Sequence, residues 1–402
     1  MEIITRRSCR LCGSRDLRDV LSLGEQYIND FVPSERINKG IKAPLDLVIC
    51  AKCSLMQLRH TAPQELLYSR YYWYRSGVTE TMRSALRDIT ADIEAKTLLR
   101  PGDVVLDIGA NDGTLLASYT VKGIHRIGCE PANNLVDMLK QNADHVIHDF
   151  WNYERYMALA KHLGVGKAKV ITAIGMFYDL EDPNKFIKDA QLALAEDGVF
   201  VAQLMCLKPM LKNNDVGNIC HEHLEYYSLD SLKYLFETNG LEIFEIVEND
   251  VNGGSYRIYA RHYKGTGIPL EEKFTLDDIR AFTKRIESNK ERCVEFIKEQ
   301  VAKGKRVYVY GASTKGNVIL QYYGLDNTLI TAAADRSPEK WGKYTVGTWI
   351  PIVSETEARL AQPDYFLVLP YAFFDEFYKR EKEWRSQGGK FILPLPEFRV
   401  AP

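Results

Sequence analysis

The sequence lacks an excess of charge of either sign. Its 402 residues include 52 Lys and Arg against 54 Asp and Glu, for a formal net charge of −2. Proteins that bind nucleic acid generally present a basic surface that neutralises phosphates. This balance therefore argues against a general nucleic-acid binder.

Long hydrophobic runs are also missing. No apolar stretch approaches the roughly 20 residues that span a bilayer, and the opening residues, MEIITRRSCRLCG, lack the apolar core of a signal peptide. We therefore expect a cytoplasmic protein that does not enter a membrane. Eight cysteines in that compartment are interpreted first as thiols or metal ligands, before disulfides.

The chain is too long for a single hydrophobic core and shows no short-period repeat, so two or three domains are expected. Residues 1–70 carry two Cys pairs and little helical periodicity. After a helix-like run over 80–98, strand-like and helical stretches alternate, which predicts a parallel sheet covered by helices on both faces. The predicted strands are 104–108, 126–130, 145–148, 170–174, 199–203, 241–247 and 255–261.

A charged helix is predicted over 276–302, and the alternation of strands and helices then begins again. The strands of this second unit are expected at 306–310, 329–335, 365–369 and 390–393. The expected fold class is α/β, with a small cysteine-rich module at 1–70, one Rossmann-like domain at 71–265 and a second at 266–402.

Four cysteines form two matched pairs, Cys9 with Cys12 and Cys50 with Cys53. Two such CxxC knuckles can converge on one tetrahedral ion, and four thiolates suit zinc. We predict a structural zinc ion without a catalytic role, because four thiolates leave no open coordination position. Free thiols or a redox pair are the alternative.

The segment Val104–Gly113 has the pattern of a buried strand that runs into a glycine turn and a helix. It lacks the dinucleotide fingerprint, because Asn111 stands at the second glycine of GxGxxG. S-Adenosylmethionine has no pyrophosphate; it needs an acidic residue after the next strand for its ribose hydroxyls, and Glu130 meets that need. A carboxylate and a ring after the third strand suit an adenine. The predicted contacts to this cofactor are Asp107, Gly109, Asn111, Gly113, Glu130, Asp149 and Phe150. A nicotinamide dehydrogenase, or a plain tight turn, is the alternative.

Residues 218–228, with the sequence NICHEHLEYYS, follow the fifth predicted strand. This is the carboxyl edge, where open α/β sheets bind ligands. The spacing is not HExxH, so a zinc-protease site is not indicated. General acid–base chemistry is favoured because histidine titrates near neutral pH, while a structural role is the alternative for His221 and His223.

Two further glycine segments adjoin predicted strands. Gly253 and Gly254 precede a strand that carries Arg257, and they suit either a close approach to a phosphate or a simple hairpin turn. Gly311–Asn317 follows a strand and resembles a phosphate loop without its Lys-Ser/Thr ending. An anion site at a helix N-terminus and plain packing both remain open there. Arg257 and Lys315 are the candidates for diphosphate contacts.

Together these motifs resemble the nucleotide-sugar C-3′-methyltransferases of deoxysugar biosynthesis. The resemblance covers nearly the whole chain. It includes the four-Cys module, Tyr71–Ser76, the cofactor turn, the His-Glu-His segment, both glycine segments, Asp335–Lys340 and Gly347–Thr348. It implies a zinc-binding module, a class I methyltransferase domain that binds S-adenosylmethionine, and a C-terminal domain that closes the substrate cleft.

The resemblance also implies a reaction. The family's substrates are 4-keto hexoses linked to a nucleoside diphosphate; a base removes the C3 proton, and the enolate attacks the methyl group of the sulfonium. By resemblance His223 is that base, with Glu222 and Tyr74 near the sugar. The implied substrate contacts are Ser76, His221, Gly254, Ser255, Arg257 and Lys315. The nucleotide sugar is the only expected partner, and the chain is expected to be a monomer or weak dimer.

The chain departs from the family pattern in three places. Cys220 replaces a common Tyr, the stretch from Ile174 to Asp179 lacks an Asn and a His that are often present, and Gln203 replaces a usual acid. These changes leave the substrate and the methylated carbon open. Cys220 as a nucleophile is an alternative, although methyl transfer to an enolate needs no covalent step. O- or N-methylation of a small metabolite, and a zinc-stapled module with an inactive methyltransferase domain, are further alternatives.

Overall fold

The N-terminal module consists of short antiparallel strands. In the computed structural model, which describes residues 2–37, 39–69, 71–270, 272 and 274–402, four strands form a sheet in the order β12-β5-β4-β2. These are β2 (Leu17–Tyr27), β4 (Lys42–Cys50), β5 (Met56–Leu58) and β12 (Glu225–Tyr226). Strand β1 (Ile4–Thr5) pairs with β6 (His60–Thr61), and β3 (Phe31–Val32) pairs with β17 (Tyr344–Thr345). The module therefore takes one strand from the middle of the chain. Arg70, where its expected boundary falls, lies outside the described residues.

The middle of the chain forms a seven-stranded sheet in the order β13-β14-β11-β10-β7-β8-β9. Its first five strands along the chain are parallel, and a final antiparallel hairpin completes it. The strands are β7 (Val104–Ile108), β8 (His125–Cys129), β9 (His145–Ile147), β10 (Ala168–Ile174), β11 (Leu194–Leu204), β13 (Leu241–Asn249) and β14 (Ser255–His262). All seven predicted strands are confirmed, most within two or three residues at each end; β11 begins five residues early.

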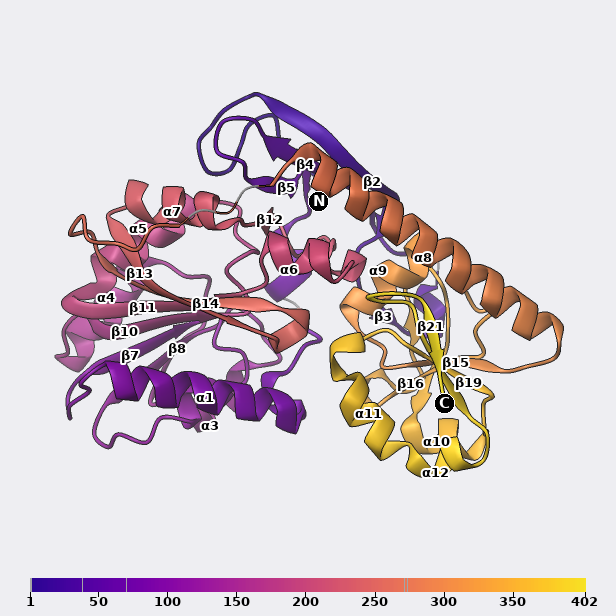
Figure 1. The fold of residues 1–402 in the computed structure, drawn as a ribbon. Coiled ribbons are helices and arrows are strands. Elements are labelled where there is room, and N and C mark those ends of the chain that lie inside the picture. The colour runs from indigo at the N-terminus through magenta and orange to yellow at the C-terminus, as the bar shows by residue number, and fades with distance from the viewer. Residues whose placement is uncertain (1, 38, 70, 271, 273) are drawn as a thin grey trace.

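Helices cover both faces of this sheet (Figure 1). One face packs against α1 (Glu80–Lys96), α2 (Thr114–Ala117) and α3 (Val136–Asn142), whose apolar side chains share a core cluster with Val105 and Val170. The other face packs against α4 (Tyr153–Leu163), α5 (Pro183–Ala193) and α7 (Leu229–Thr238). Because the strands alternate their side chains between the faces, each face has its own apolar cluster.

The C-terminal unit begins with α8 (Leu276–Ala302), whose predicted bounds are confirmed and whose start is a capping box between Thr275 and Asp278. It contains a six-stranded sheet in the order β18-β16-β15-β19-β20-β21, parallel except for its last strand. The strands are β15 (Val307–Tyr310), β16 (Ala332–Asp335), β18 (Ile352–Ser354), β19 (Tyr365–Val368), β20 (Lys390–Leu393) and β21 (Arg399–Ala401). The helices are α9 (Thr314–Tyr323), α10 (Glu355–Leu360), α11 (Phe374–Arg380) and α12 (Lys382–Ser386). β16 begins three residues later than predicted, because the preceding residues form a turn in which Leu329 donates to the Asp326 carbonyl.

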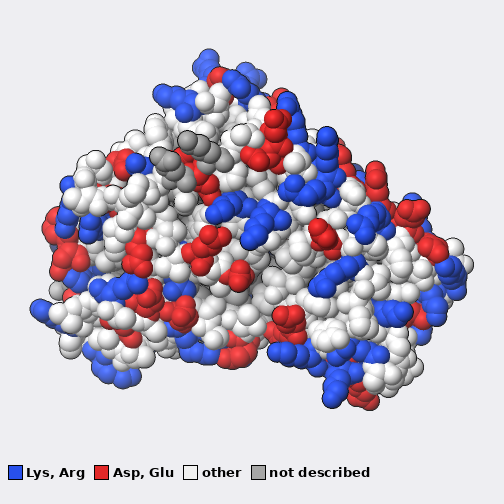
Figure 2. Space-filling model, viewed as in Figure 1, with Lys and Arg blue, Asp and Glu red and all other residues white. Residues whose placement is uncertain are grey.

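The N-terminal module lies across the junction of the two α/β domains (Figure 1). A single apolar cluster contains side chains from β4 and β5, from α6 (Leu207–Lys212), from the segment before β12, and from α8, β15 and α9. The three parts of the chain therefore share buried surface. Figure 2 shows Lys and Arg interspersed with Asp and Glu over one face of the molecule, as the balanced composition suggests. Within the described ranges, no helix is long and apolar enough to cross a membrane.

Candidate active site

The four predicted metal ligands converge in the N-terminal module. The sulfur atoms of Cys9, Cys12, Cys50 and Cys53 all lie within 4.8 Å of one another, and the closest pairs are 3.4 and 3.5 Å apart. Tetrahedral zinc with Zn–S bonds of about 2.3 Å places its sulfurs about 3.8 Å apart, so the donor set fits zinc. Four thiolates would fill all four positions of a tetrahedral ion, so this is a closed, structural type of site.

The turn after β7 needs two glycines for steric reasons. Gly109 and Gly113 adopt left-handed conformations, with φ of 71° and 80°. A Cβ at Gly109 would lie 2.8 Å from the Met176 Cγ, and one at Gly113 would lie 2.6 Å from the Asn142 Cβ. Asn111 is also left-handed, at φ 52°, a conformation that Asn tolerates better than most residues. The turn is therefore packed closely on its inner side, where a side chain at either glycine would collide with its neighbours.

Glu130, at the end of β8, lies beneath this turn. Its carboxylate accepts hydrogen bonds from the main-chain N–H groups of Asn111, at 2.8 Å, and Ala132, at 2.9 Å. It is only 5% exposed, and burial raises its pKa. Each carboxylate oxygen retains a second acceptor site, so the pair suits two vicinal hydroxyl groups.

Three other predicted cofactor residues, Asp107, Asp149 and Phe150, lie around the turn. Asp107 is buried below the turn, where Thr172 donates to it at 2.6 Å and burial raises its pKa to about 7. Asp149 pairs with Arg155 at 2.7 Å and accepts from the main-chain N–H of Phe150. Phe150 is 37% exposed and lines a cavity between the two α/β domains, whereas neither aspartate lines it.

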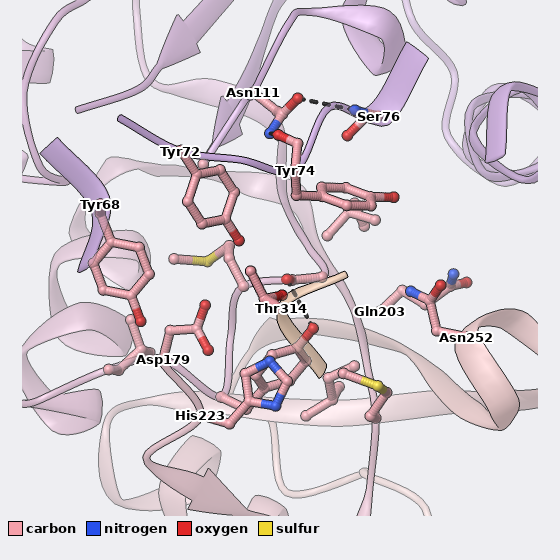
Figure 3. A pocket seen from close by; sticks show the side chains of 18 of the residues that line it. Tyr68, Tyr72, Tyr74, Ser76, Asn111, Asp179, Gln203, His223, Asn252 and Thr314 are labelled. Atoms are coloured by element: carbon pink, nitrogen blue, oxygen red, sulfur yellow. Dashed lines mark hydrogen bonds between the residues drawn. The ribbon is translucent and has the colours of Figure 1, made fainter. Parts of the chain in front are cut away.

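The tyrosine-rich segment, Tyr71–Ser76, is tied to the cofactor turn through Asn111. The Asn111 amide accepts from the Ser76 N–H at 3.0 Å and donates to the Tyr74 carbonyl at 3.1 Å. Next to it, the Asp112 carboxylate accepts from the Gly77 N–H at 2.8 Å. Figure 3 shows Ser76 and Tyr74 beside Asn111 as a result. The sequence suggested neither this anchoring nor the role of Asp112.

A cavity of about 500 Å³ opens between the two α/β domains. Its walls come from the tyrosine-rich segment, from the carboxyl edge of the first sheet, and from the loops after β15 and β19 of the second. This volume lies within the usual range for sites that bind small molecules and cofactors. The predicted site residues that line it are Tyr74, Ser76, Gly109, Asn111, Glu130, Phe150, His223, Ser255 and Lys315.

His223 faces this cavity with one ring nitrogen free. Its Nδ1 lies 2.8 Å from the Asn218 carbonyl oxygen, and since a carbonyl only accepts, Nδ1 carries the proton and Nε2 has a lone pair. The side chain is 9% exposed. Burial, followed by the positive charge of Lys315, lowers its pKa to about 3. The imidazole is therefore neutral at physiological pH with a lone pair on Nε2, and a neighbouring negative charge would have to raise this pKa for it to act as an efficient base.

The two residues before His223 point into the N-terminal module instead. Glu222 accepts from the Asn29 amide at 3.2 Å, and His221 Nε2 donates to the Ala43 carbonyl at 3.0 Å. Neither is among the residues that line the cavity. The physical reason is that this stretch leads into β12, which pairs with β5 of the module. Tyr68 donates to the Glu222 carbonyl at 2.7 Å and fixes the segment from the cavity side.

Arg257 and Gly254 also lie outside the cavity lining. The Arg257 guanidinium donates to Asp88 at 2.7 Å and to Gln203 at 3.1 Å, so it ties β14 to α1 and to β11. A Cβ at Gly254 would lie 2.5 Å from that of Pro209, so this glycine permits α6 to pack closely. Ser255 does line the cavity, and Lys315 lies there at the start of α9 with its ammonium 3.7 Å from Asp215.

Asp179 is a cavity residue that the sequence marked only as a departure from a family pattern. It follows β10, is 7% exposed and lines the cavity near His223 (Figure 3). Tyr68, Tyr72 and Tyr178 line the same region. Tyr72 belongs to the segment Tyr71–Ser76 that carries part of the family resemblance, but no spacing in the sequence linked these tyrosines to Asp179.

Three family models match consecutive parts of the chain. A putative zinc binding domain matches residues 9–68, a methyltransferase domain matches 78–246, and a C-methyltransferase C-terminal domain matches 250–396. The chain is 31% identical over 411 residues to the C-methyltransferase NovU of Streptomyces niveus, an alignment that covers 98% of this chain and 96% of that protein.

Solved structures that resemble parts of the chain are methyltransferases at low identity. Magnesium protoporphyrin IX methyltransferase from Synechocystis PCC 6803 aligns with a TM-score of 0.36 and 13% identity, over 48% of this chain and 91% of that chain. Mitomycin 7-O-methyltransferase MmcR aligns with a TM-score of 0.35 and 13% identity, over 46% of this chain and 54% of that chain.

Proposed function

The chain belongs to the C-methyltransferase family, and from that premise we propose that it methylates C3 of a 4-keto-deoxysugar linked to a nucleoside diphosphate. Its methyl donor is S-adenosylmethionine, and its N-terminal module is a zinc site. The observation that carries the proposal is the neutral His223, whose free Nε2 faces a cavity between the two α/β domains.

The cofactor-facing side of the cavity fits S-adenosylmethionine, which when bound supplies an electrophilic methyl group on its sulfonium. Glu130 would hold the ribose hydroxyls with the acceptor sites that its two main-chain contacts leave open. Phe150 would lie against the adenine ring. Asp107, Gly113 and Asp149 would act by supporting the turn and the Phe150 segment, because they do not line the cavity.

On the substrate side, His223 is the proposed base. A ketone at C4 acidifies the C3 proton, and Nε2 of His223 removes it while the Asn218 carbonyl keeps the proton on Nδ1. Lys315, at the start of α9, would face the diphosphate. Since the Lys315 charge contributes to the low pKa of His223, an anionic substrate beside Lys315 would raise that pKa and strengthen the base.

The remaining predicted substrate residues divide according to their position. Tyr74, Ser76 and Ser255 line the cavity and are proposed to contact the sugar nucleotide. Glu222 and His221 are proposed to position the His223 segment against the zinc module. Arg257 and Gly254 are not proposed as substrate contacts. The Arg257 guanidinium donates to Asp88 within the fold, and Gly254 packs closely against Pro209. The C-terminal domain, residues 266–402, would close the cleft.

The proposed reaction is tested by mass spectrometry. We expect the enzyme to add one methyl group on carbon to a nucleoside-diphosphate 4-keto-6-deoxyhexose, and to exchange the C3 proton with deuterium from solvent when the cofactor is omitted. His223→Ala should abolish both activities, because no other neutral imidazole among the described residues lines the cavity. His162→Ala, on the exposed face of α4, is the matched control and should retain both.

Two results would contradict this assignment. A methyl group found on oxygen or nitrogen without C3 exchange would indicate a heteroatom methyltransferase. Full exchange by His223→Ala would leave the chemistry possible but would remove His223 as the base.

A further inference from the structure

Asp179 is a buried acid that has no role in the proton transfer proposed for His223. It lies after β10, in the loop where its main-chain N–H donates to the Met176 carbonyl at 3.1 Å. Its side chain is more than nine-tenths buried and lines the cavity. In Figure 3 its carboxyl group lies between the phenol of Tyr68 and the imidazole of His223. Its Oδ1 atom has no hydrogen-bond partner among the residues that the structure describes.

The groups that face Asp179 favour its neutral form. Burial raises its pKa well above the ordinary value, and the negative charges of Glu222 and Glu225 raise it further. Lys315 opposes this effect, but its ammonium contacts the Met205 sulfur at 2.8 Å and is 3.7 Å from Asp215. The remaining titratable groups around it are buried and have raised pKa values, so they keep their protons: Tyr68, Tyr72, Tyr178, Cys220 and Tyr226.

Two of the phenols around Asp179 already donate elsewhere. Tyr68 donates to the Glu222 carbonyl at 2.7 Å, and Tyr178 donates to the Gly175 carbonyl at 2.8 Å. His223 uses its one N–H on the Asn218 carbonyl. None of these three groups therefore donates to the Asp179 carboxyl group, whose unpartnered Oδ1 lies beside the base in the cavity lining.

We propose that Asp179, as a neutral carboxylic acid, donates a hydrogen bond to the C4 oxygen of the keto sugar and stabilises the enolate that His223 generates. The inference rests on the proposed function. When His223 takes the C3 proton, the C–H electron pair forms the C3–C4 double bond and the carbonyl pair moves to the C4 oxygen. Asp179 holds that oxygen without giving up its proton. When C3 attacks the methyl group, the C4 carbonyl re-forms, S-adenosylhomocysteine is released, and the proton on His223 passes to solvent. Placing a donor where charge develops is among the largest contributions that enzymes make to such steps.

Two variants separate a hydrogen-bond donor from a charged group. Asp179→Asn keeps the shape and offers an N–H donor, whereas Asp179→Ala removes the donor. With the 4-keto-6-deoxyhexose nucleotide, presented with dTDP, UDP or GDP, we expect Asp179→Ala to lower kcat for C3 exchange by about 10²–10³-fold with little change in KM. Asp179→Asn should retain kcat within about tenfold, since an amide N–H also occurs as an oxyanion donor.

The pH profile gives a second, independent readout. The wild-type rate should fall at alkaline pH as Asp179 loses its proton, and in Asp179→Asn this fall should disappear because an amide does not titrate. Asp197→Asn, at an exposed carboxylate that pairs with Lys169, is the matched control and should keep the wild-type profile. Calorimetric binding of S-adenosylmethionine at wild-type affinity checks that each variant is folded.

The outcomes distinguish this inference from the function on which it rests. Wild-type enzyme that exchanges C3 of none of these sugars would overturn both. If the wild type is active but Asp179→Asn is as inactive as Asp179→Ala, an ionised carboxylate is required, as for a base or for binding an ammonium group. That result would overturn the proposed role of Asp179 and leave the proposed function in place. Wild-type kcat in Asp179→Ala would do the same.

Discussion

Replacing a glycine in the cofactor turn has two costs, backbone strain from a positive φ and steric conflict of the new Cβ with its neighbours. Gly113 has a positive φ and, in addition, no room for a Cβ beside Asn142. Gly164, which ends α4, has a positive φ of 70° but nothing within 4 Å of its Cβ position. The pair therefore separates backbone strain from steric conflict.

We expect Gly164→Ala to lower the free energy of unfolding by roughly 1–2 kcal/mol, the usual cost of a left-handed non-glycine residue. Gly113→Ala should cost more and should also weaken binding of S-adenosylmethionine, because the turn must move away from Asn142. Urea denaturation and calorimetry measure the two effects. Equal destabilisation by both substitutions, with unchanged cofactor affinity, would show that the close packing at Gly113 does not matter.

Arg257 shows that the type of a residue does not determine which groups it binds. Next to two glycines, an arginine suggested a diphosphate contact. In the fold it lies on β14, where Asp88 of α1 and Gln203 of β11 occupy its donors. Since these partners lie 169 and 54 residues away along the chain, no local pattern could have revealed them.

At the scale of elements, β12 links the zinc module to the active site. Glu225 of β12 pairs with Gln57 of β5, and His223 lies only two residues before it. The Arg10 main-chain N–H, between Cys9 and Cys12, also donates to the Gln57 side chain at 3.1 Å. The metal knuckle, the module's sheet and the segment that carries the base are therefore in direct contact.

Removing the metal should consequently affect the base more than the cofactor. We expect about one zinc ion per chain in protein purified without chelator, and its loss in Cys50→Ser/Cys53→Ser. That variant should lose C3 exchange but retain binding of S-adenosylmethionine, because the cofactor turn belongs to the other sheet. Metal analysis, exchange and calorimetry check this, with Cys293→Ala in α8 as the control for loss of a cysteine outside the module. Wild-type exchange without zinc would show that the module does not position His223.

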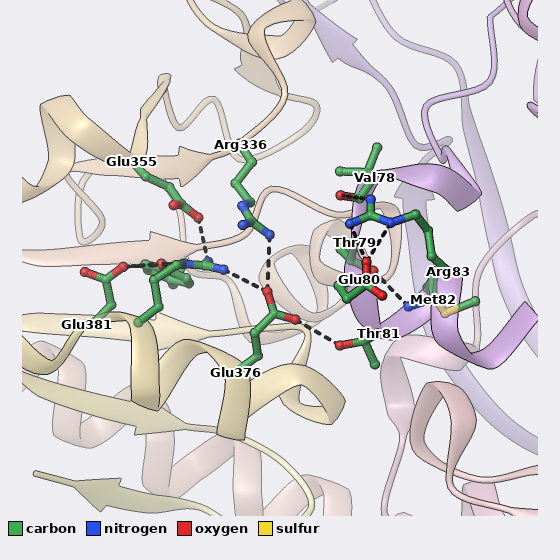
Figure 4. A network of polar contacts seen from close by, with 12 residues as sticks. Val78, Thr79, Glu80, Thr81, Met82, Arg83, Arg336, Glu355, Glu376 and Glu381 are labelled. Carbon is green, nitrogen blue, oxygen red and sulfur yellow. Dashed lines mark hydrogen bonds and ion pairs between the residues drawn. The ribbon is translucent and has the colours of Figure 1, made fainter. Parts of the chain in front are cut away.

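At the scale of the whole molecule, polar contacts join the tyrosine-rich segment and α1 to the second α/β domain. Tyr71 donates to Glu339 at 2.6 Å, and Arg75 lies 3.3 Å from the same carboxylate. Thr81 of α1 donates to Glu376 of α11 at 3.0 Å, and Glu376 is held in turn by Arg336 and Arg380 (Figure 4). These contacts are partly exposed, so each contributes little, and they should weaken with salt.

Glu339→Ala should therefore loosen closure of the cleft without affecting chemistry. We expect KM for the nucleotide sugar to rise about 1.4- to fivefold, in line with the roughly 0.2–1 kcal/mol typical of exposed pairs, with cofactor affinity unchanged. Steady-state kinetics at low and high salt measure this, and the difference from wild type should shrink at high salt. Glu383→Ala, exposed on α12, is the control. An unchanged KM at low salt would contradict a role in closure.

The sequence by itself determined the chemistry of the parts. Strand positions followed from apolar runs, the zinc ligands from two matched CxxC pairs, and the cofactor turn from glycines before a helix, all of which depend on residues close together in the chain. His223 as the candidate base came from resemblance, and the fold places it in the cavity.

Only the tertiary structure decided which side chains meet. It turned Glu222 and His221 toward the zinc module, bound Arg257 within the first sheet, and brought Asp179 beside His223, 44 residues later in the sequence. The physical reason is that a side chain's role depends on its burial and its partners. These are set when β12 joins the module's sheet and when two domains close over one cavity.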